Sequence, residues 1–346
     1  MSRSRAAPYV ASPLPSAQYE AWLARSLPPV EAVRDGILSI PVPFPGPVRF
    51  TYCYALQAAD GVVVVDPGWD SEEGWAILAA GLAPVGGVAA VRRIVITHFH
   101  PDHVGMSARL CAESGAEVLI HTDDLAFLRR TGPDVVGEND AWLRRFGVPE
   151  NTRHKLLSGA AASSRWSLPH TTDSMGALMD GAIIPTTAGS LRIVHTPGHS
   201  PGHVCAVIDE QELVFTGDHV LPRIRSGLGF TFDQSDDPLA DYLASLRRCE
   251  PFADYEAAPA HEYRFRGLGA RIADLAAARA DRTEELRVAA GKEPRPLWEL
   301  AASLTWYRRW DDMDPQTQVS ALLEARAHLV YLAGQGRLPV RHESWA

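Results

Sequence analysis

No stretch of this sequence is apolar for long enough to cross a membrane. A membrane-spanning helix needs about 18 or more consecutive apolar residues, and the chain of 346 residues has no such run. The first residues, Met1 to Tyr19, contain arginines and lack the continuous apolar core of a secretory signal. We therefore expect a cytoplasmic protein with no membrane partner.

Cysteine is scarce and unpaired in the sequence. The four cysteines, Cys53, Cys111, Cys205 and Cys249, are widely separated and form no C-x-x-C pair. This spacing argues against thiolate metal ligands and a disulfide framework, so each is expected to be a reduced, partly buried residue. A G-x-S-x-G turn is also absent, which argues against a serine hydrolase.

Positive charge is outweighed by negative charge. The formal net charge is −9, so no global positive field attracts nucleic acid, although a local basic groove is compatible with this composition. With 46% hydrophobic and 22% charged residues, the composition is that of an ordinary globular protein. The length suits one large domain and one small one.

Short apolar segments that end in turn residues predict a sheet-rich region followed by helices. Strands are predicted at 36–44, 48–56, 62–65, 93–97, 116–121, 191–195, 203–208, 213–216 and 255–259, and helices at 104–114, 238–248, 269–289, 297–304 and 316–333. The strand signal ends after Arg264. We therefore predict a catalytic domain over 1–264, with a helical insertion over about 122–181, and a helical C-terminal domain over 265–346.

The segment from Thr97 to His103, with the sequence THFHPDH, carries the strongest chemical signal. Residues two apart in an extended loop point the same way, so His98 and His100 can face one point. The chain then turns at Pro101 into a helix that can direct Asp102 and His103 at a neighbouring point. Imidazole and carboxylate ligands suit zinc, and also iron or manganese. The alternative, in which Asp102 only caps the helix and the histidines lie on the surface, fits this density of ligands poorly.

This segment resembles the H-x-H-x-D-H signature of the metallo-β-lactamase superfamily, and four other motifs follow the order of that family. They are Val65-Asp66-Pro67-Gly68, Thr196-Pro197-Gly198-His199, Thr216-Gly217-Asp218 and Pro259-Ala260-His261. The resemblance implies an α/β fold, the four-layer αββα sandwich, with a dinuclear metal centre. It implies that His98, His100 and His199 hold one metal, that Asp102, His103 and His261 hold the second, and that Asp218 bridges them.

Asp66 and Asp102 are the carboxylates that we expect to take part in catalysis. Asp66 would accept a hydrogen bond from a ligating imidazole and fix its orientation; taken alone, it could equally form a turn. Asp102 is also a predicted ligand.

The other polar residues near these motifs receive weaker assignments. His195 and His203 are expected to support the ligands or edge the core, and His219 to point away from the metals. Arg223 and Arg225 either bind an anionic part of a substrate or are simply solvated.

The predicted reaction is hydrolysis. Two Zn²⁺ ions would lower the pKa of a bridging water, and the resulting hydroxide would attack a thioester, lactone or related small acyl substrate. The alternative is a phosphodiesterase or endoribonuclease that uses the same two metals and a basic channel. Ranked below these are a true β-lactamase, a sulfur dioxygenase and a non-enzymatic DNA-binding protein with a structural metal.

The C-terminal segment resembles the winged-helix-like domain of the lactamase-β-2-like subgroup, which includes RNA-cleaving enzymes and polyketide-releasing thioesterases. The acidic charge balance and the short remaining wing, 339–346, favour a packing role or a homodimer contact over nucleic-acid binding. In the insertion, Trp142, Phe146, Trp166 and Met175 either form an apolar wall over the metals or pack as ordinary helices do.

Overall fold

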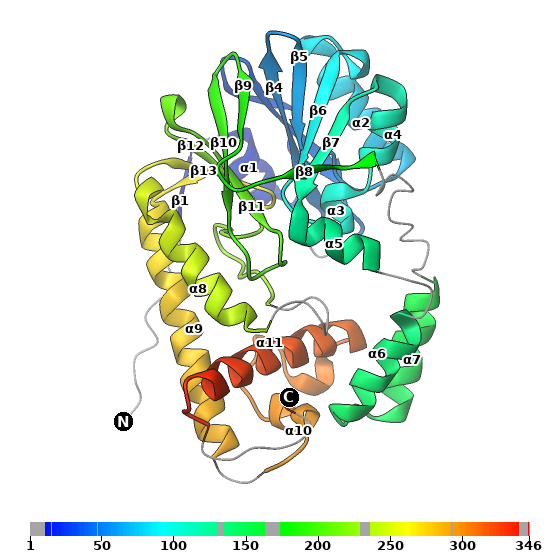
Figure 1. Cartoon of the computed structure of the whole chain (residues 1–346), viewed down its shortest axis with the longest axis vertical. Coiled ribbons are helices and arrows are strands. Elements are labelled where there is room, and N and C mark those ends of the chain that lie inside the picture. Colours follow the sequence, from blue (N-terminus) through cyan, green and yellow to red (C-terminus); the bar gives the residue numbers. More distant parts are fainter. Residues whose placement is uncertain are drawn as a thin grey trace.

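The computed structural model describes residues 11–14, 16–46, 48–130, 135–162, 174–228, 236–291, 294–338 and 345. Its strands form two seven-stranded sheets, with the orders β1-β14-β13-β12-β11-β10-β9 and β2-β3-β4-β5-β6-β7-β8. Figure 1 shows the two sheets side by side at one end of the molecule and a group of helices at the other.

The second sheet begins with antiparallel strands and ends with parallel ones. Its members are β2 (Glu31–Arg34), β3 (Ile37–Pro43), β4 (Phe50–Ala58), β5 (Gly61–Val65), β6 (Val91–Ile96), β7 (Glu117–His121) and β8 (Gly176–Leu178). The tight turn before Gly61 joins β4 to β5, as the Asp60-Gly61 pair predicts. The pairs β5–β6, β6–β7 and β7–β8 are parallel, so their carboxyl ends meet at one edge of the sheet.

The first sheet is mostly antiparallel. It comprises β1 (Ser12–Pro13), β9 (Ile183–Thr186), β10 (Gly189–His195), β11 (Val204–Ile208), β12 (Leu213–Gly217), β13 (Glu256–Pro259) and β14 (Phe265–Arg266). Among the described strands of this sheet, only β12 and β13 pair in parallel. As a result, β12 and β13 deliver Asp218 and His261 to the same edge of the sheet.

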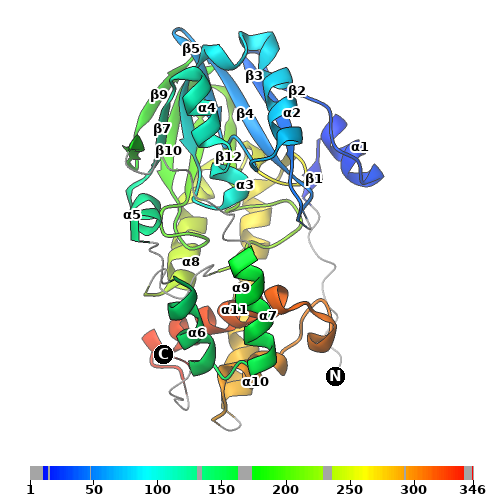
Figure 2. The same cartoon turned by 90° about the vertical axis from the view of Figure 1, so that its right-hand side faces the viewer.

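Helices cover the outer faces of both sheets, and apolar residues fill the space between them. One cluster lies between the sheets, with Tyr54, Val65, Leu191 and Phe215 among its members. A second packs α2 (Glu72–Leu82) and α4 (Ser107–Ser114) on one sheet, and a third packs α8 (Pro238–Cys249) and α9 (Leu268–Ala290) on the other. Figure 2 shows these layers from the side. The predicted four-layer αββα sandwich is therefore confirmed.

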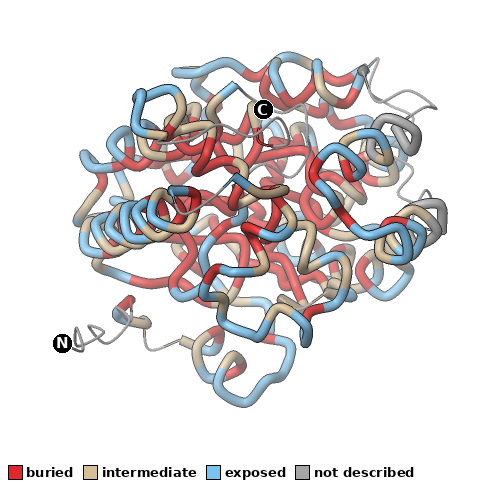
Figure 3. The backbone as a smooth tube through the Cα atoms, turned by 90° about the horizontal axis from the view of Figure 1, so that it is seen from below, coloured by how far each residue is buried: buried red, intermediate tan, exposed pale blue. Residues whose placement is uncertain are grey.

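The helical insertion and the C-terminal helices share one core. Leu143, Phe146 and Val148 lie in the same buried cluster as Leu297 and Leu322 of the C-terminal region. The elements involved are α6 (Val135–Arg145), α7 (Glu150–Ala162), α10 (Leu297–Ala302) and α11 (Pro315–Gly334). Seen from this end, buried residues form a continuous interior inside an exposed rim (Figure 3). The insertion thus packs against the C-terminal helices.

Three predictions on the insertion and the C-terminal region have different outcomes. Trp142 and Phe146 belong to the core shared with the C-terminal helices, whereas Met175 belongs to the cluster that packs α2 and α4 on the second sheet. Trp166 lies outside the described residues. The C-terminal region is helical as predicted, but the winged-helix likeness stays a prediction, and most of the expected wing, 339–344, is outside the described residues. The domain boundary at residue 264 also stays a prediction; β14 still pairs with β1 and β13.

Sequence patterns missed several elements. The segment before the first predicted strand contains α1 (Ala17–Ala24) and β2, and the predicted insertion contains β8 and ends just before β9. The helix predicted at 104–114 is two helices, α3 (Pro101–Val104) and α4. The break occurs because Met106 N donates to Gly68 O (3.0 Å), and Gly68 N donates to His103 O (3.3 Å). The loop after β5 therefore competes for the hydrogen bonds that a continuous helix would use.

Among the described residues, no helix combines the length and the apolar character that crossing a bilayer requires. The four cysteines are free thiols; Cys53, Cys205 and Cys249 are buried.

Replacement of Phe146 tests whether the insertion depends on the C-terminal helices. Phe146 is fully buried in the shared cluster, so Phe146→Ala is expected to lower the free energy of unfolding by about 3–5 kcal/mol. Urea unfolding measures the change. Tyr307→Ala, at an 80% exposed position, is the control and is expected to change stability by less than about 0.5 kcal/mol. Equal effects of the two variants would contradict a shared core.

Candidate metal centre

The histidine-rich loop begins where the buried strand β6 ends. Val65 of β5 pairs in parallel with Val95 of β6, so the two strands end side by side. Asp66 follows the first strand, and Thr97 and His98 follow the second. Beyond them, α3 begins at Pro101 and carries Asp102 and His103 in its first turn. Local strand pairing therefore places both motifs at one edge of the sheet.

Three imidazoles and one carboxylate form the first group of candidate ligands. His98 Nε2 lies 2.8 Å and His199 Nε2 lies 3.1 Å from His100 Nδ1. Asp218 Oδ2 lies 3.5 Å from His199 Nε2. One potential ligand atom of each of these four residues lies within 4.8 Å of the others, and all four residues are buried.

Asp102, His103 and His261 form the second group. Asp102 Oδ2 lies 3.4 Å from His261 Nε2 and 3.6 Å from His103 Nε2. Thr51 Oγ1 donates a hydrogen bond to the same carboxylate oxygen (3.2 Å). The start of β4 therefore supports this group from outside the motifs that the sequence identified.

Asp218 lies between the two groups. Its Oδ2 faces His199, whereas its Oδ1 lies 3.2 Å from His261 Nε2 and 3.7 Å from His103 Nε2. The two oxygens of one carboxylate thus point at different groups. A carboxylate in this position can contact two cations at once.

Hydrogen bonds on the nitrogen that faces away from the cluster orient several of the imidazole rings. Because the backbone carbonyls of Gly227 and Phe50 accept from His199 Nδ1 (2.9 Å) and His261 Nδ1 (2.8 Å), each ring presents Nε2 to the cluster. His103 Nδ1 lies 2.8 Å from Asp66 Oδ2 and likewise presents Nε2. A hydrogen bond on one ring nitrogen fixes which nitrogen can bind a metal.

Asp66 supports the loop. Its Oδ1 accepts from Thr97 N (2.7 Å), and its Oδ2 accepts from Thr97 Oγ1 (2.7 Å) as well as from His103. Its backbone adopts φ 52°, a left-handed conformation that aspartate tolerates better than most residues. Asp66 is buried, and these protein donors occupy both oxygens, so it acts on the centre through His103 and Thr97.

Burial and neighbouring charge set the protonation of the cluster. Burial, and then the nearby histidines, hold the pKa of His98 well below its ordinary value; burial likewise lowers the pKa of His100 and of His199. Burial alone would lower the pKa of His103, but Asp102, Asp66 and Asp218 raise it to about 9. The first group is thus electrically neutral at its rings, which is the state that metal binding requires.

Gly198 allows His199 to approach the cluster. Its backbone has φ +130°, and a Cβ there would lie 2.6 Å from the backbone N of Tyr242 in α8. Only glycine fits this close contact. The Pro-Gly-His motif therefore has a structural explanation at this position.

Asp124 is a supporting residue that sequence reasoning missed. It lies in the first turn of α5 (Thr122–Arg130) and is fully buried. Its Oδ2 accepts from Phe99 N (2.9 Å) and Ser200 Oγ (2.8 Å), and its Oδ1 accepts from Gly202 N (2.6 Å). Burial raises the pKa of this carboxyl to about 7, against the effect of these donors. Asp124 thus ties the loop of His98 and His100 to the loop of His199.

The flanking histidines lie outside the two groups. His203 Nε2 accepts from Asp218 N (3.1 Å), and its Nδ1 lies 2.8 Å from Thr196 Oγ1. The ring of His219 packs against Tyr242, with ring centroids 5.0 Å apart. His203 therefore supports the backbone of Asp218, and His219 points away from the cluster.

The two arginines after Asp218 are exposed. The guanidinium of Arg223 lies over the ring of Trp22, 4.8 Å from its centroid. Neither arginine belongs to the two groups of candidate ligands.

A third trio, His121, Asp123 and His195, is arranged differently. The rings of His121 and His195 are stacked, with centroids 3.8 Å apart and planes 12° apart. Because the lone pair of an imidazole lies in its ring plane, two parallel rings do not converge on one cation. We therefore assign no metal to this trio.

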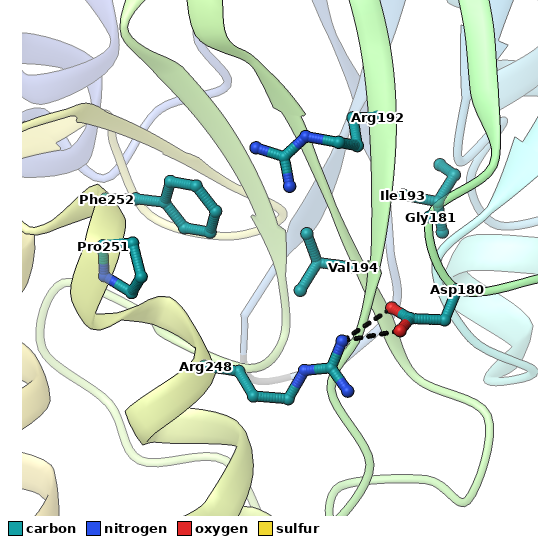
Figure 4. Close-up of a pocket in the computed structure, with 8 residues that line it drawn as sticks. All are labelled: Asp180, Gly181, Arg192, Ile193, Val194, Arg248, Pro251 and Phe252. Atoms are coloured by element: carbon teal, nitrogen blue, oxygen red, sulfur yellow. Dashed lines mark hydrogen bonds and ion pairs between the residues drawn. The ribbon is translucent and has the colours of Figure 1, made fainter.

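A surface pocket of about 350 Å³ lies on the outer face of the first sheet (Figure 4). It is lined by Arg192, Val194, Arg248 and Phe252, among others, and contains none of the candidate ligands. Both arginines are paired, Arg248 with Asp180 and Arg192 with Asp209. The pocket is separate from the metal chemistry.

The residues present fit two divalent cations. The first group supplies neutral imidazoles and a carboxylate, and the second supplies a carboxylate with two imidazoles. His103 Nε2 is buried and makes no hydrogen bond to protein. Such donors suit Zn²⁺, iron or manganese.

Substitution of Asp124 tests its supporting role. In Asp124→Asn, one oxygen that accepts backbone or hydroxyl donors becomes an NH₂ donor, so a buried donor loses its partner. Zinc affinity, measured by competition with a chromophoric chelator, is expected to fall about 10–100-fold. The neighbouring Asp123→Asn, on a side chain that is 54% exposed, is the control. Wild-type affinity in Asp124→Asn would show that the two loops hold their positions without it.

Several known proteins are similar to this chain in sequence and in fold. A curated atrochrysone carboxyl ACP thioesterase of Aspergillus fumigatus is 25% identical over 238 residues, which are 68% of this chain and 58% of that protein. A probable metallo-hydrolase of Bacillus subtilis is 25% identical over 288 residues, covering 78% of this chain and 85% of its own length. The crystal structure of a metallo-β-lactamase family protein from Thermus thermophilus has a TM-score of 0.74 and 27% identity, and the match covers 88% of this chain and 95% of that one. The sequence profile of the metallo-beta-lactamase superfamily matches residues 46–261, well over half of the chain, and the chain belongs to that superfamily.

Proposed function

We propose that this protein is a dinuclear metal-dependent hydrolase that acts on a thioester or a related acyl substrate. The observation that carries the proposal is the position of Asp218, whose two carboxylate oxygens face two separate groups of histidines. A mononuclear structural zinc site needs only four ligands to complete its tetrahedron, and the first group alone supplies four. The second group is therefore explained only by a second metal.

The proposed ligand sets follow the two groups. His98, His100 and His199 would hold one cation, Asp102, His103 and His261 the other, and Asp218 both. Two divalent cations at such a centre would lower the pKa of a bound water and polarise an acyl carbonyl. Zinc is the proposed metal, and iron and manganese fit the same donors.

The protein's own residues keep this centre ready for that chemistry. Burial would raise the pKa of Asp102, but the charge of His103 and the hydrogen bond from His261 hold it below its ordinary value. Before a metal binds, Asp102 therefore stays ionised at neutral pH, and His103 would lose its Nε2 proton on becoming a ligand. Asp66 holds His103 through Nδ1, and Thr51 holds Asp102, so both can keep their positions while a substrate enters.

The acyl substrate class is supported by the relatives. One matched protein is a thioesterase by name, but this chain covers only 58% of it. The substrate is thus part of the proposal. The small-molecule partner, a homodimer and a cytoplasmic location all stay predictions.

The metal count tests the centre itself. Purified protein reconstituted with zinc is expected to hold about two equivalents by atomic emission after dialysis. His98→Ala and His261→Ala should each reduce this to about one, because they remove ligands from different groups, and Asp218→Ala should weaken both sites. The exposed His154→Ala is the control, and should leave the count at two. A wild-type count of one or none would contradict a dinuclear centre.

Substrate class is tested with zinc-loaded protein on a panel of acyl thioesters, lactones and labelled single-stranded RNA. Thioester or lactone hydrolysis is expected, and His100→Ala should reduce it by more than about a hundredfold, since the first group loses a ligand. His154→Ala should hydrolyse at the wild-type rate. Cleavage of RNA alone, lost in His100→Ala, would contradict the acyl substrate and make this protein a phosphodiesterase.

A further inference from the structure

The loop that follows β12 touches the candidate metal centre at two points. Its first residue is Asp218 itself, and Ser226 Oγ donates a hydrogen bond back to the carbonyl oxygen of Asp218. The next residue, Gly227, accepts from His199 Nδ1 (2.9 Å). The path of residues 218–227 therefore decides where Asp218 and His199 lie.

Two buried arginines of α9 hold this loop by its carbonyl groups. Arg271 Nε donates to Leu221 O (2.8 Å), and its Nη2 donates to Ile224 O (2.7 Å). Arg279 Nη2 donates to Ser226 O. The two residues are only 2% and 3% exposed. A loop has no neighbouring strand to satisfy its carbonyls, and these guanidinium groups take that role.

Arg279 is in turn held by α11. It forms an ion pair with Glu324, and the other oxygen of this carboxylate accepts from Leu228 N (3.4 Å). The guanidinium also lies over the ring of Tyr242, 5.1 Å from its centroid. Burial would raise the pKa of Glu324, but Arg279 and His328 lower it to about 2, so the pair is charged.

We propose that the C-terminal helices α9 and α11 position the metal centre, with Arg279 as the positioning residue that places His199 and Asp218 through Ser226 and Gly227. Three consecutive contacts connect these helices to the candidate ligands: Glu324 to Arg279, Arg279 to Ser226 O, and Ser226 to Asp218 O. The proposal rests on the metal centre of the proposed function. It gives the C-terminal region a role inside the enzyme, because Arg271 and Arg279 donate hydrogen bonds to the carbonyl groups of this loop.

The variant that tests this role is Arg279→Lys. Lysine keeps a positive charge near Glu324, but it lacks the planar fork that reaches Ser226 O at the same time. An uncharged residue would leave Glu324 buried without a cation and could prevent folding. Arg282→Lys is the matched control on the same helix, since Arg282 pairs with Glu285 and Thr305 O and donates no hydrogen bond to the described residues of the loop, 218–228.

The measurements are zinc affinity by chelator competition and hydrogen exchange of the amides of residues 218–228, both on full-length protein. Arg279→Lys is expected to bind zinc about 10-fold or more weakly and to exchange these amides faster, while Arg282→Lys matches the wild type. Wild-type affinity and wild-type exchange in a folded Arg279→Lys would overturn the proposal. A wild-type protein that binds no zinc would instead overturn the proposed function.

Ser226→Ala keeps the test decisive if Arg279→Lys does not fold. It removes the hydroxyl that reaches the carbonyl of Asp218 and leaves the helices and the Arg279–Glu324 pair intact. Zinc affinity is expected to fall several-fold, with the unfolding midpoint of the metal-free protein close to that of the wild type. Unchanged affinity in Ser226→Ala would show that the loop does not place Asp218.

Discussion

Main-chain hydrogen bonds join the two sheets at the edge where the candidate ligands gather. Val204 N of the first sheet donates to Thr97 O beside the second (2.9 Å), and Tyr52 N of the second sheet donates to Ala260 O beside the first (2.8 Å). Thr97 precedes His98, and Ala260 precedes His261. The ligand loops therefore cannot separate without breaking the seam between the sheets. This constraint brings together His98 and His261, which are 163 positions apart in the chain.

The seam also concentrates buried polar groups, which must be satisfied. Burying an unpaired charge is costly, whereas a charge with several hydrogen bonds is tolerated. The buried carboxylates of Asp66 and Asp124 each accept hydrogen bonds from three donors that belong to the loops themselves. The donors are mainly backbone N–H groups and short hydroxyls of the loops. The hydrogen bonds that offset the free-energy cost of burying the two carboxylates are therefore the same ones that hold the loops in place.

The sequence predicted the parts of this site that depend on local pattern. His98, His100, Asp102 and His103 follow one strand within six residues of one another, and the motifs at Asp218 and His261 follow strands too, so strand ends and motif order sufficed. Asp124 was missed because an acidic residue in a first helical turn is ordinarily explained by capping and the helix dipole. Its partners, Phe99 and Ser200, are 25 and 76 positions away. Arg279 was missed for the same reason, since no spacing rule connects α9 to Ser226.

In the sequence, the insertion and the C-terminal helices look like two separate additions to the sandwich. In space, Phe146 and Leu297 belong to one core. Each addition also contributes one buried ionisable residue that contacts the ligand loops, Asp124 from α5 and Arg279 from α9. The two residues act on opposite sides of His199: Asp124 accepts from Ser200 and Gly202 after it, and Arg279 holds the loop whose Gly227 carbonyl accepts from its ring. A side chain such as His199 that is restrained from both sides loses little further conformational freedom when it binds a metal ion, which favours a preorganised site. The helical additions are thus as much a part of the centre's geometry as the sheets that carry its ligands.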